Sequence, residues 1–214
     1  MVSSVTINPP NTTDFQPQFE LEGLMGTCFH PSDIRTLSKG TLRIQRFLFG
    51  SAVPPQNKKD VRISYTPIPT DPSPRTPIQF NDIVEYRSST ALPSSKPARV
   101  VGIDTLNTAS ASPTRFKWRG KGLLMIASSR WQLLGYHHHT SSDPQPDSTT
   151  PWAVTYFEKT LFTPAGLDIY ARKPEGLPEN LLQDIISGLR GVGGEVAVLA
   201  ESLFEVQRSE QGQP

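Results

Sequence analysis

Apolar and polar residues alternate along several short segments of the chain, most clearly between residues 152 and 172. One face of residues 152–159 carries Trp152, Val154, Tyr156 and Glu158, and the intervening positions form a second face. A proline and a glycine at positions 164 and 166 favour a turn, after which the alternation resumes at 167–171. A period of two residues is typical of strands, so this region predicts two strands joined by one turn.

The same alternation recurs in other segments, with prolines and glycines concentrated between them. Further predicted strands are residues 61–68, 80–87, 98–106, 115–120, 123–127 and 130–137, together with a first strand near 26–34. The 15 glycines and 21 prolines punctuate short apolar runs, which argues against a helical bundle. We therefore expect a mainly β protein: an antiparallel barrel of about eight strands.

The hydrophobic period changes near the C-terminus. Apolar residues from Leu181 to Val192 recur at the 3.6-residue spacing of an amphipathic helix, and Gly191, Gly193 and Gly194 then interrupt it. The predicted organisation is a flexible leader at 1–18, a barrel at 19–176, a helical segment at 177–206 and a tail at 207–214. Within the barrel we expect an insertion or loop at 38–60 and a disordered loop at 140–151.

Charge and cysteine content restrict the classes of partner and compartment. Lys and Arg total 21 against 20 Asp and Glu, a net charge of +1 that gives no electrostatic argument for nucleic acid or a membrane surface. The single cysteine, Cys28, excludes an intrachain disulfide and favours a reducing compartment. We expect a cytoplasmic protein; the oligomeric state is not determined by the sequence.

The strand order and several segments resemble the lipocalins and the wider calycin group, and look most like lipocalin-like proteins found mainly in filamentous fungi. The resembling segments include FELEGLMGT, VRISYTPIP, FNDIVEYRS, FKWRGKG, IASSRWQLLGY and WAVTYFEKTLFTPAGLDIYAR. The family's Gly-X-Trp motif would begin at Gly26, with Cys28 in place of the tryptophan, and Arg172 matches the arginine that usually caps that tryptophan. Either the barrel floor closes differently here, or the region from Cys28 to Lys59 is an unusual first strand.

This resemblance implies a closed barrel whose interior holds one small, largely apolar molecule. Residues predicted to contact it are the aromatic side chains Tyr86, Trp118, Trp131, Trp152 and Tyr156, although the same residues could be plain core. No cofactor is predicted. The alternatives are a cofactor-independent isomerase or cyclase acting in the same cavity, and an interaction module that uses the helix or the 38–60 segment.

Two carboxylates share strand faces with aromatic residues. Asp82 is in register with Phe80 and Tyr86, and Glu158 is in register with Trp152 and Tyr156. If these faces point inward, burial raises the carboxyl pKa and suits both acids to proton transfer in the enzyme alternative. The competing interpretation places them at the solvated rim of the barrel.

A run of three histidines at 137–139 is the remaining candidate for chemistry. Adjacent residues of a strand point to opposite faces, so at most two of the three could share a metal ion. No cysteine or carboxylate lies close by in the sequence, and we therefore predict no metal site.

Overall fold

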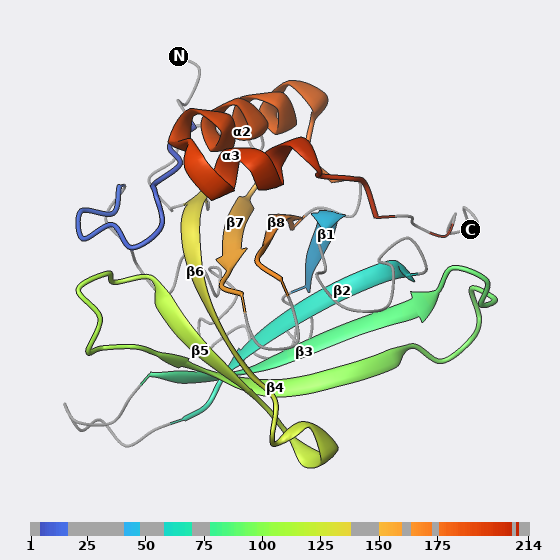
Figure 1. The fold of residues 1–214 in the computed structure, drawn as a ribbon. Coiled ribbons are helices and arrows are strands. Elements are labelled where there is room, and N and C mark those ends of the chain that lie inside the picture. The colour runs from blue at the N-terminus through green and yellow to red at the C-terminus, as the bar shows by residue number, and fades with distance from the viewer. Residues whose placement is uncertain are drawn as a thin grey trace, which may run out of the picture.

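Eight antiparallel strands form a closed barrel in the computed structural model, which describes residues 5–16, 41–47, 58–69, 78–137, 150–159, 164–172, 176–206 and 209 (Figure 1). The strands are β1 (Thr41–Phe47), β2 (Lys58–Pro67), β3 (Gln79–Ser88), β4 (Ala98–Leu106), β5 (Arg115–Gly120), β6 (Ser128–His137), β7 (Trp152–Phe157) and β8 (Gly166–Ala171). Each strand pairs with the next along the chain, and β1 pairs with β8 to close the barrel. The prediction of a mainly β, antiparallel barrel is confirmed.

The interior of the barrel is filled at its centre by aromatic side chains from alternate strand positions. Phe80 on β3 is fully buried, and Phe116, Trp131 and Tyr65 pack around it with ring centroids 4.4–6.2 Å apart. These four residues, named here the aromatic floor, belong to one buried cluster with residues of β2, β6, β7 and β8. The period-2 pattern read from the sequence thus corresponds to real inward and outward faces.

Two helices cover the outer face of β7 and β8. They are α2 (Glu179–Val192) and α3 (Gly194–Glu201), which lie above the ends of β6, β7 and β8 in Figure 1. Between them Gly193 has φ +77°, a left-handed conformation that glycine adopts without strain. The predicted helix and its interruption are therefore observed, and α2 buries Leu182, Ile185, Ile186 and Leu189 against this outer face.

Residues 5–16 correct the predicted flexible leader, because they pack against the barrel. The Asn8 amide N–H and the Asn8 side-chain Nδ2 both donate to the carbonyl of Leu134, at 2.7 and 3.0 Å. That carbonyl lies at an irregularity in the β6–β7 pairing, between Leu133 and Gly135. Beyond it, Phe15 is buried in the interior cluster and stacks on Tyr136 at 6.2 Å. Polarity and prolines suggested disorder, but the irregular strand offers an acceptor that this segment satisfies.

The segment predicted as an insertion or loop, 38–60, instead contains the whole of β1 and the beginning of β2. Tertiary pairing with both β2 and β8 stabilises β1, and no periodicity of its own was visible in the sequence. Removing 38–60 would therefore open the barrel. The alternative first strand predicted at 26–34 lies outside the described residues.

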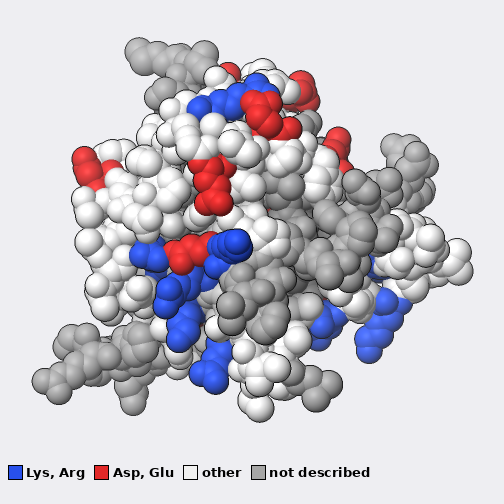
Figure 2. All heavy atoms as spheres, in the orientation of Figure 1, with Lys and Arg blue, Asp and Glu red and all other residues white. Residues whose placement is uncertain are grey.

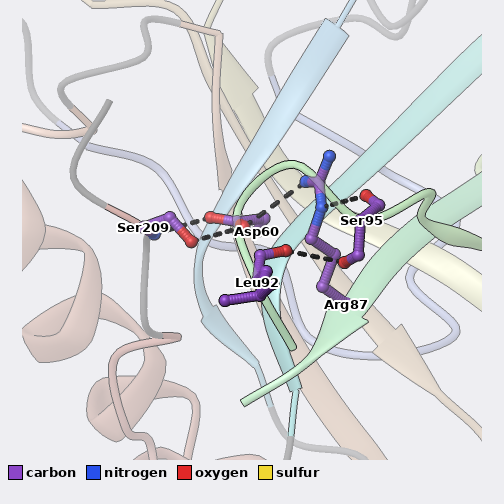
Figure 3. A network of polar contacts seen from close by, with 5 residues as sticks. All are labelled: Asp60, Arg87, Leu92, Ser95 and Ser209. Carbon is purple, nitrogen blue, oxygen red and sulfur yellow. Dashed lines mark hydrogen bonds and ion pairs between the residues drawn. The ribbon is translucent and has the colours of Figure 1, made fainter. Parts of the chain in front are cut away.

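At the start of β2, Asp60 joins the strand to the C-terminal tail (Figure 3). Ser209 donates to the Asp60 carboxylate from its backbone N at 2.6 Å and from its Oγ at 2.8 Å. Arg87 approaches the same carboxylate at 3.4 Å and donates to the carbonyl of Ser95 at 2.8 Å. This network fixes the β3–β4 turn and the tail to one strand end, although the two segments are far apart in sequence.

Candidate functional site

Three aromatic side chains lie at one rim of the barrel. In an up-and-down barrel the odd-numbered strands all end at the same rim, and Tyr86, Trp118 and Phe157 lie within two residues of the ends of β3, β5 and β7. All three are half-buried and pack on the interior cluster. We name them the aromatic rim. They are more accessible than the aromatic floor, whose four side chains are all buried.

A lysine at the start of β2 also forms part of this rim. Lys58 Nζ lies 4.5 Å from the centroid of the Tyr86 ring, a cation–π geometry. Burial lowers the pKa of Lys58. The start of β2 therefore contributes a cation beside one of the three aromatic side chains of the rim.

Asp82 lies on the inner face of β3, between the aromatic floor and the aromatic rim. Phe80 on one side of it is fully buried and Val84 on the other side is half-buried, whereas Asp82 itself is 9% exposed. Burial raises its pKa to about 7, and a hydrogen bond with the Trp118 side chain opposes that rise. Among the described residues its Oδ1 has no hydrogen-bond partner. The interpretation that places Asp82 at the solvated rim is therefore wrong, because its side chain is buried on the inward face of β3.

A glycine makes the contact between Trp118 and Asp82 possible. Gly102 is the β4 residue paired with Asp82, and a Cβ built on it would lie 2.2 Å from Trp118 Nε1. The indole therefore lies directly over the bare backbone of Gly102. Any larger residue at position 102 would displace Trp118 from Asp82.

Asp104 is a second interior carboxyl that the sequence analysis did not select. It is fully buried, and Trp131 Nε1 donates to its Oδ1 at 2.7 Å. Burial and the nearby charge of Asp82 raise its pKa well above the usual value. Its Oδ2 has no partner within the described part of the chain. Asp82 and Asp104, named here the acid pair, thus place two desolvated carboxyls beside aromatic rings.

A chain of hydrogen bonds joins polar side chains of β7 and β8 inside the barrel. Thr155 donates to Tyr170 Oη at 3.1 Å, and that hydroxyl donates to Asp168 at 3.0 Å. Burial raises the pKa of Tyr65, and the charges of Asp82, Asp104 and Asp168 add to it. The sequence signal for these acids was an isolated aspartate within an apolar strand, in register with aromatic or small neighbours.

Two of the five predicted ligand-contacting aromatics face away from the interior. Trp152 and Tyr156 pack in the outer cluster beneath the helices, and Tyr156 Oη donates to Glu195 of α3 at 2.6 Å. The inward face of β7 is formed by the alternate residues, including Ala153 and Thr155. Their small size leaves room for Tyr170 inside, while helix burial selects the bulkier face for the outside. The expectation for Trp152 and Tyr156 was therefore wrong.

The remaining predicted site residues divide between core, rim and undescribed chain. Trp131 is 3% exposed and belongs to the aromatic floor, whereas Tyr86 and Trp118 belong to the aromatic rim. Glu158 forms an ion pair with Arg115 and keeps 26% of its side-chain surface exposed, as the rim interpretation predicts.

The barrel-closing pair and the histidine run are described only in part. The Arg172 backbone N–H donates to the Pro151 carbonyl at 3.1 Å. Gly26, His138 and His139 lie outside the described residues. Within the described ranges, no group of three His, Cys, Asp or Glu could hold a metal ion, and no helix is long and apolar enough to cross a membrane.

An up-and-down closed barrel of eight strands is the architecture of the lipocalins, and this chain has that class of fold by its own strand pairing. No protein-family model and no curated protein sequence matches it. Solved structures similar to it are apocrustacyanin C2 (12% identity, TM-score 0.48), apocrustacyanin C1 (12%, 0.49) and lobster apocrustacyanin A1 (11%, 0.49). The alignments cover 97–98% of this chain and 93–94% of those chains. Similarity this low carries no functional argument.

Proposed function

We propose that the barrel binds a small, largely apolar molecule that carries a hydrogen-bond donor. The observation that carries this proposal is the position of Asp82: a buried carboxyl with an unsatisfied oxygen among the described residues, located between a filled floor and an accessible rim. A buried acceptor without a partner costs roughly 1–3 kcal/mol. A ligand donor at Asp82 would remove that cost.

The aromatic rim supplies the apolar part of the same proposed site. Tyr86 and Trp118 are only half-buried, and covering their exposed apolar surface with a ligand is worth about 25 cal/mol for each Å². A mostly apolar lining with few placed polar groups is typical of small-molecule sites. The expected ligand is therefore an aromatic or polycyclic compound with an amine or hydroxyl group.

A pair of fluorescent probes tests both parts of the proposal. At pH 8, 1-aminoanthracene is titrated beside anthracene, which has the same ring system without the amine. We expect saturable binding of both, tighter for 1-aminoanthracene. Asp82→Leu should weaken the amine by about 10-fold, the value of one hydrogen bond, and leave anthracene unaffected or tighter.

Two further variants separate the rim from the outer face. Trp118→Ala should weaken both probes, because both rings lose the same stacking surface. Trp152→Phe is the matched control, since Trp152 lies beneath the helices, and it should change neither affinity. Absence of saturable binding by either probe, or equal losses in the rim variant and the control, would overturn the proposal.

The enzyme alternative is favoured by one specific observation, the interior position of Asp82, where burial raises the carboxyl pKa to about 7. A carboxyl with that pKa exchanges a proton near neutral pH and suits a cofactor-independent isomerase or cyclase. Asp82→Asn would then abolish turnover while ligand affinity persists. Glu158 does not share this interior position, because it pairs with Arg115 at the rim. The cytoplasmic location stays a prediction.

A further inference from the structure

The connection between β5 and β6 exposes apolar side chains to solvent. Residues 123–127 were expected to form a strand, but a single turn of 3-10 helix, η3 (Gly122–Leu124), replaces it. Leu124 is 39% exposed, Met125 61% and Ile126 96%. Three consecutive apolar residues presented in this way are unusual for a β-hairpin connection, where polar turn residues dominate.

Backbone hydrogen bonds hold this connection in a defined conformation. Leu124 N donates to Lys121 O at 3.2 Å, and Ala127 N donates to Leu124 O at 2.9 Å. The turn also folds back onto Gly120, where a Cβ would lie 2.3 Å from Leu124 O. The apolar side chains are therefore held outward by a hydrogen-bonded backbone.

Basic residues surround this apolar tip. Lys117, Arg119, Lys121 and Arg130 are all exposed, and none of them forms an ion pair with a residue in the described ranges. Lys117 and Arg130 lie opposite each other across the β5–β6 pair. Figure 2 shows Lys and Arg gathered over the lower part of this face, where η3 lies in Figure 1, and most Asp and Glu over the upper part. The net charge of +1 thus hides a strong local separation of charge.

We propose that this tip docks on the surface of an anionic lipid bilayer. The apolar residues at its end would enter the boundary between headgroups and acyl chains. The four cations, three of them on β5 and β6 and Lys121 at the start of the turn, would meet the lipid phosphates. This order matches the layers of a bilayer: apolar side chains protrude and charges lie behind them.

The position of the tip determines which end of the barrel would face the membrane. The β5–β6 connection begins at Lys121, three residues after Trp118 of the aromatic rim. Docking would therefore turn the rim of the barrel toward the membrane, from which an apolar ligand could enter. This inference goes beyond the proposed ligand binding and does not depend on it, because docking is measured without any ligand.

Vesicle flotation tests the proposal. The full chain is mixed with vesicles of phosphatidylcholine and phosphatidylserine at 7:3, and with pure phosphatidylcholine vesicles, at 50 and 300 mM salt. We expect binding to the anionic vesicles that weakens with salt. The double variant M125S/I126S should bind about 10-fold more weakly, through lost apolar burial. K121Q should bind about 5-fold more weakly, the value of one cation at an anionic surface.

The control is Val198→Ser on α3, an apolar residue that is 71% exposed on a different element. It should leave vesicle binding unchanged. Circular dichroism and thermal unfolding of each variant confirm that the barrel is intact. The proposal is overturned if folded wild-type protein does not float with anionic vesicles at 50 mM salt. Equal losses in M125S/I126S and the control would overturn it as well, as would undiminished binding by M125S/I126S.

Discussion

Replacing Asp82 by asparagine is expected to flatten the pH dependence of stability. Aspartate in the unfolded chain titrates near 3.8, whereas burial raises the Asp82 pKa to about 7 in the folded protein. Between these two values the folded state keeps a proton that the unfolded state has released. The free energy of unfolding therefore falls as the pH rises from about 4 to about 7, and stays low above that.

The magnitude follows from the separation of the two pKa values. One pH unit corresponds to about 1.4 kcal/mol, so the wild-type protein should lose about 4 kcal/mol between pH 4 and pH 8 through this one group. The asparagine side chain of D82N has no charge to desolvate at any pH, and its amide oxygen can still accept from Trp118. The stability difference between D82N and wild type should thus shift by about 4 kcal/mol in favour of the variant over that range.

Urea unfolding followed by circular dichroism, repeated at one-unit steps from pH 4 to pH 8, measures this difference. Asp184→Asn is the control, because Asp184 is exposed on α2, and its curve should run parallel to wild type. Parallel curves for D82N and wild type would refute the argument, since they would mean that Asp82 is solvated or that its ionisation is equally costly in both states.

Two further predictions concern the packing of the N-terminal segment and are read from the same urea unfolding curves. In α2, Gly188→Ala should destabilise the protein by about 1–3 kcal/mol, because the new Cβ would lie 2.8 Å from Ile7 Cγ1 and overpacking outweighs the gain in helix propensity. Gly191→Ala is the matched control, because a Cβ at position 191 would have no neighbouring atom within 4 Å. This variant should raise the free energy of unfolding by up to about 1 kcal/mol through its better helix propensity. Equal changes in the free energy of unfolding at the two sites would contradict the packing of Gly188 against Ile7. Asn8→Ala should lower the free energy of unfolding by about 1–3 kcal/mol, because the buried Leu134 carbonyl loses the hydrogen bond from Asn8 Nδ2. An unchanged urea midpoint would show that residues 5–16 do not pack on the barrel.

The strands with clear alternation were predictable, and the strand that lacks it was not. Residues 80–87 and 98–106 carry their own period of two, so β3 and β4 were located within about one residue. For β1 the pattern was absent, and its place is set by pairing with β2 and β8. The apolar run at 123–127 met the pattern of a strand but forms a turn, because the hairpin must reverse there.

In the candidate site, too, some features were predictable from the alternation of residues and others depend on tertiary packing. Parity along β3 places Asp82 with Phe80 and Tyr86, and that relation held without knowledge of the fold. Parity cannot say which face is inward. On β7 the helices cover Trp152 and Tyr156 and make theirs the outer face.

The class of fold, the C-terminal helix with its break at Gly193, and the sharing of faces within each strand were all predictable from the amino-acid pattern. These features are local: they follow from residue spacing and backbone preference over a few residues. Three other features became visible only in the folded molecule: residues 5–16 pack on the barrel, the two carboxyls of the acid pair lie near each other inside it, and cations lie near an exposed apolar tip. Each of these depends on contacts between segments distant in the chain, which a pattern of neighbouring residues does not encode.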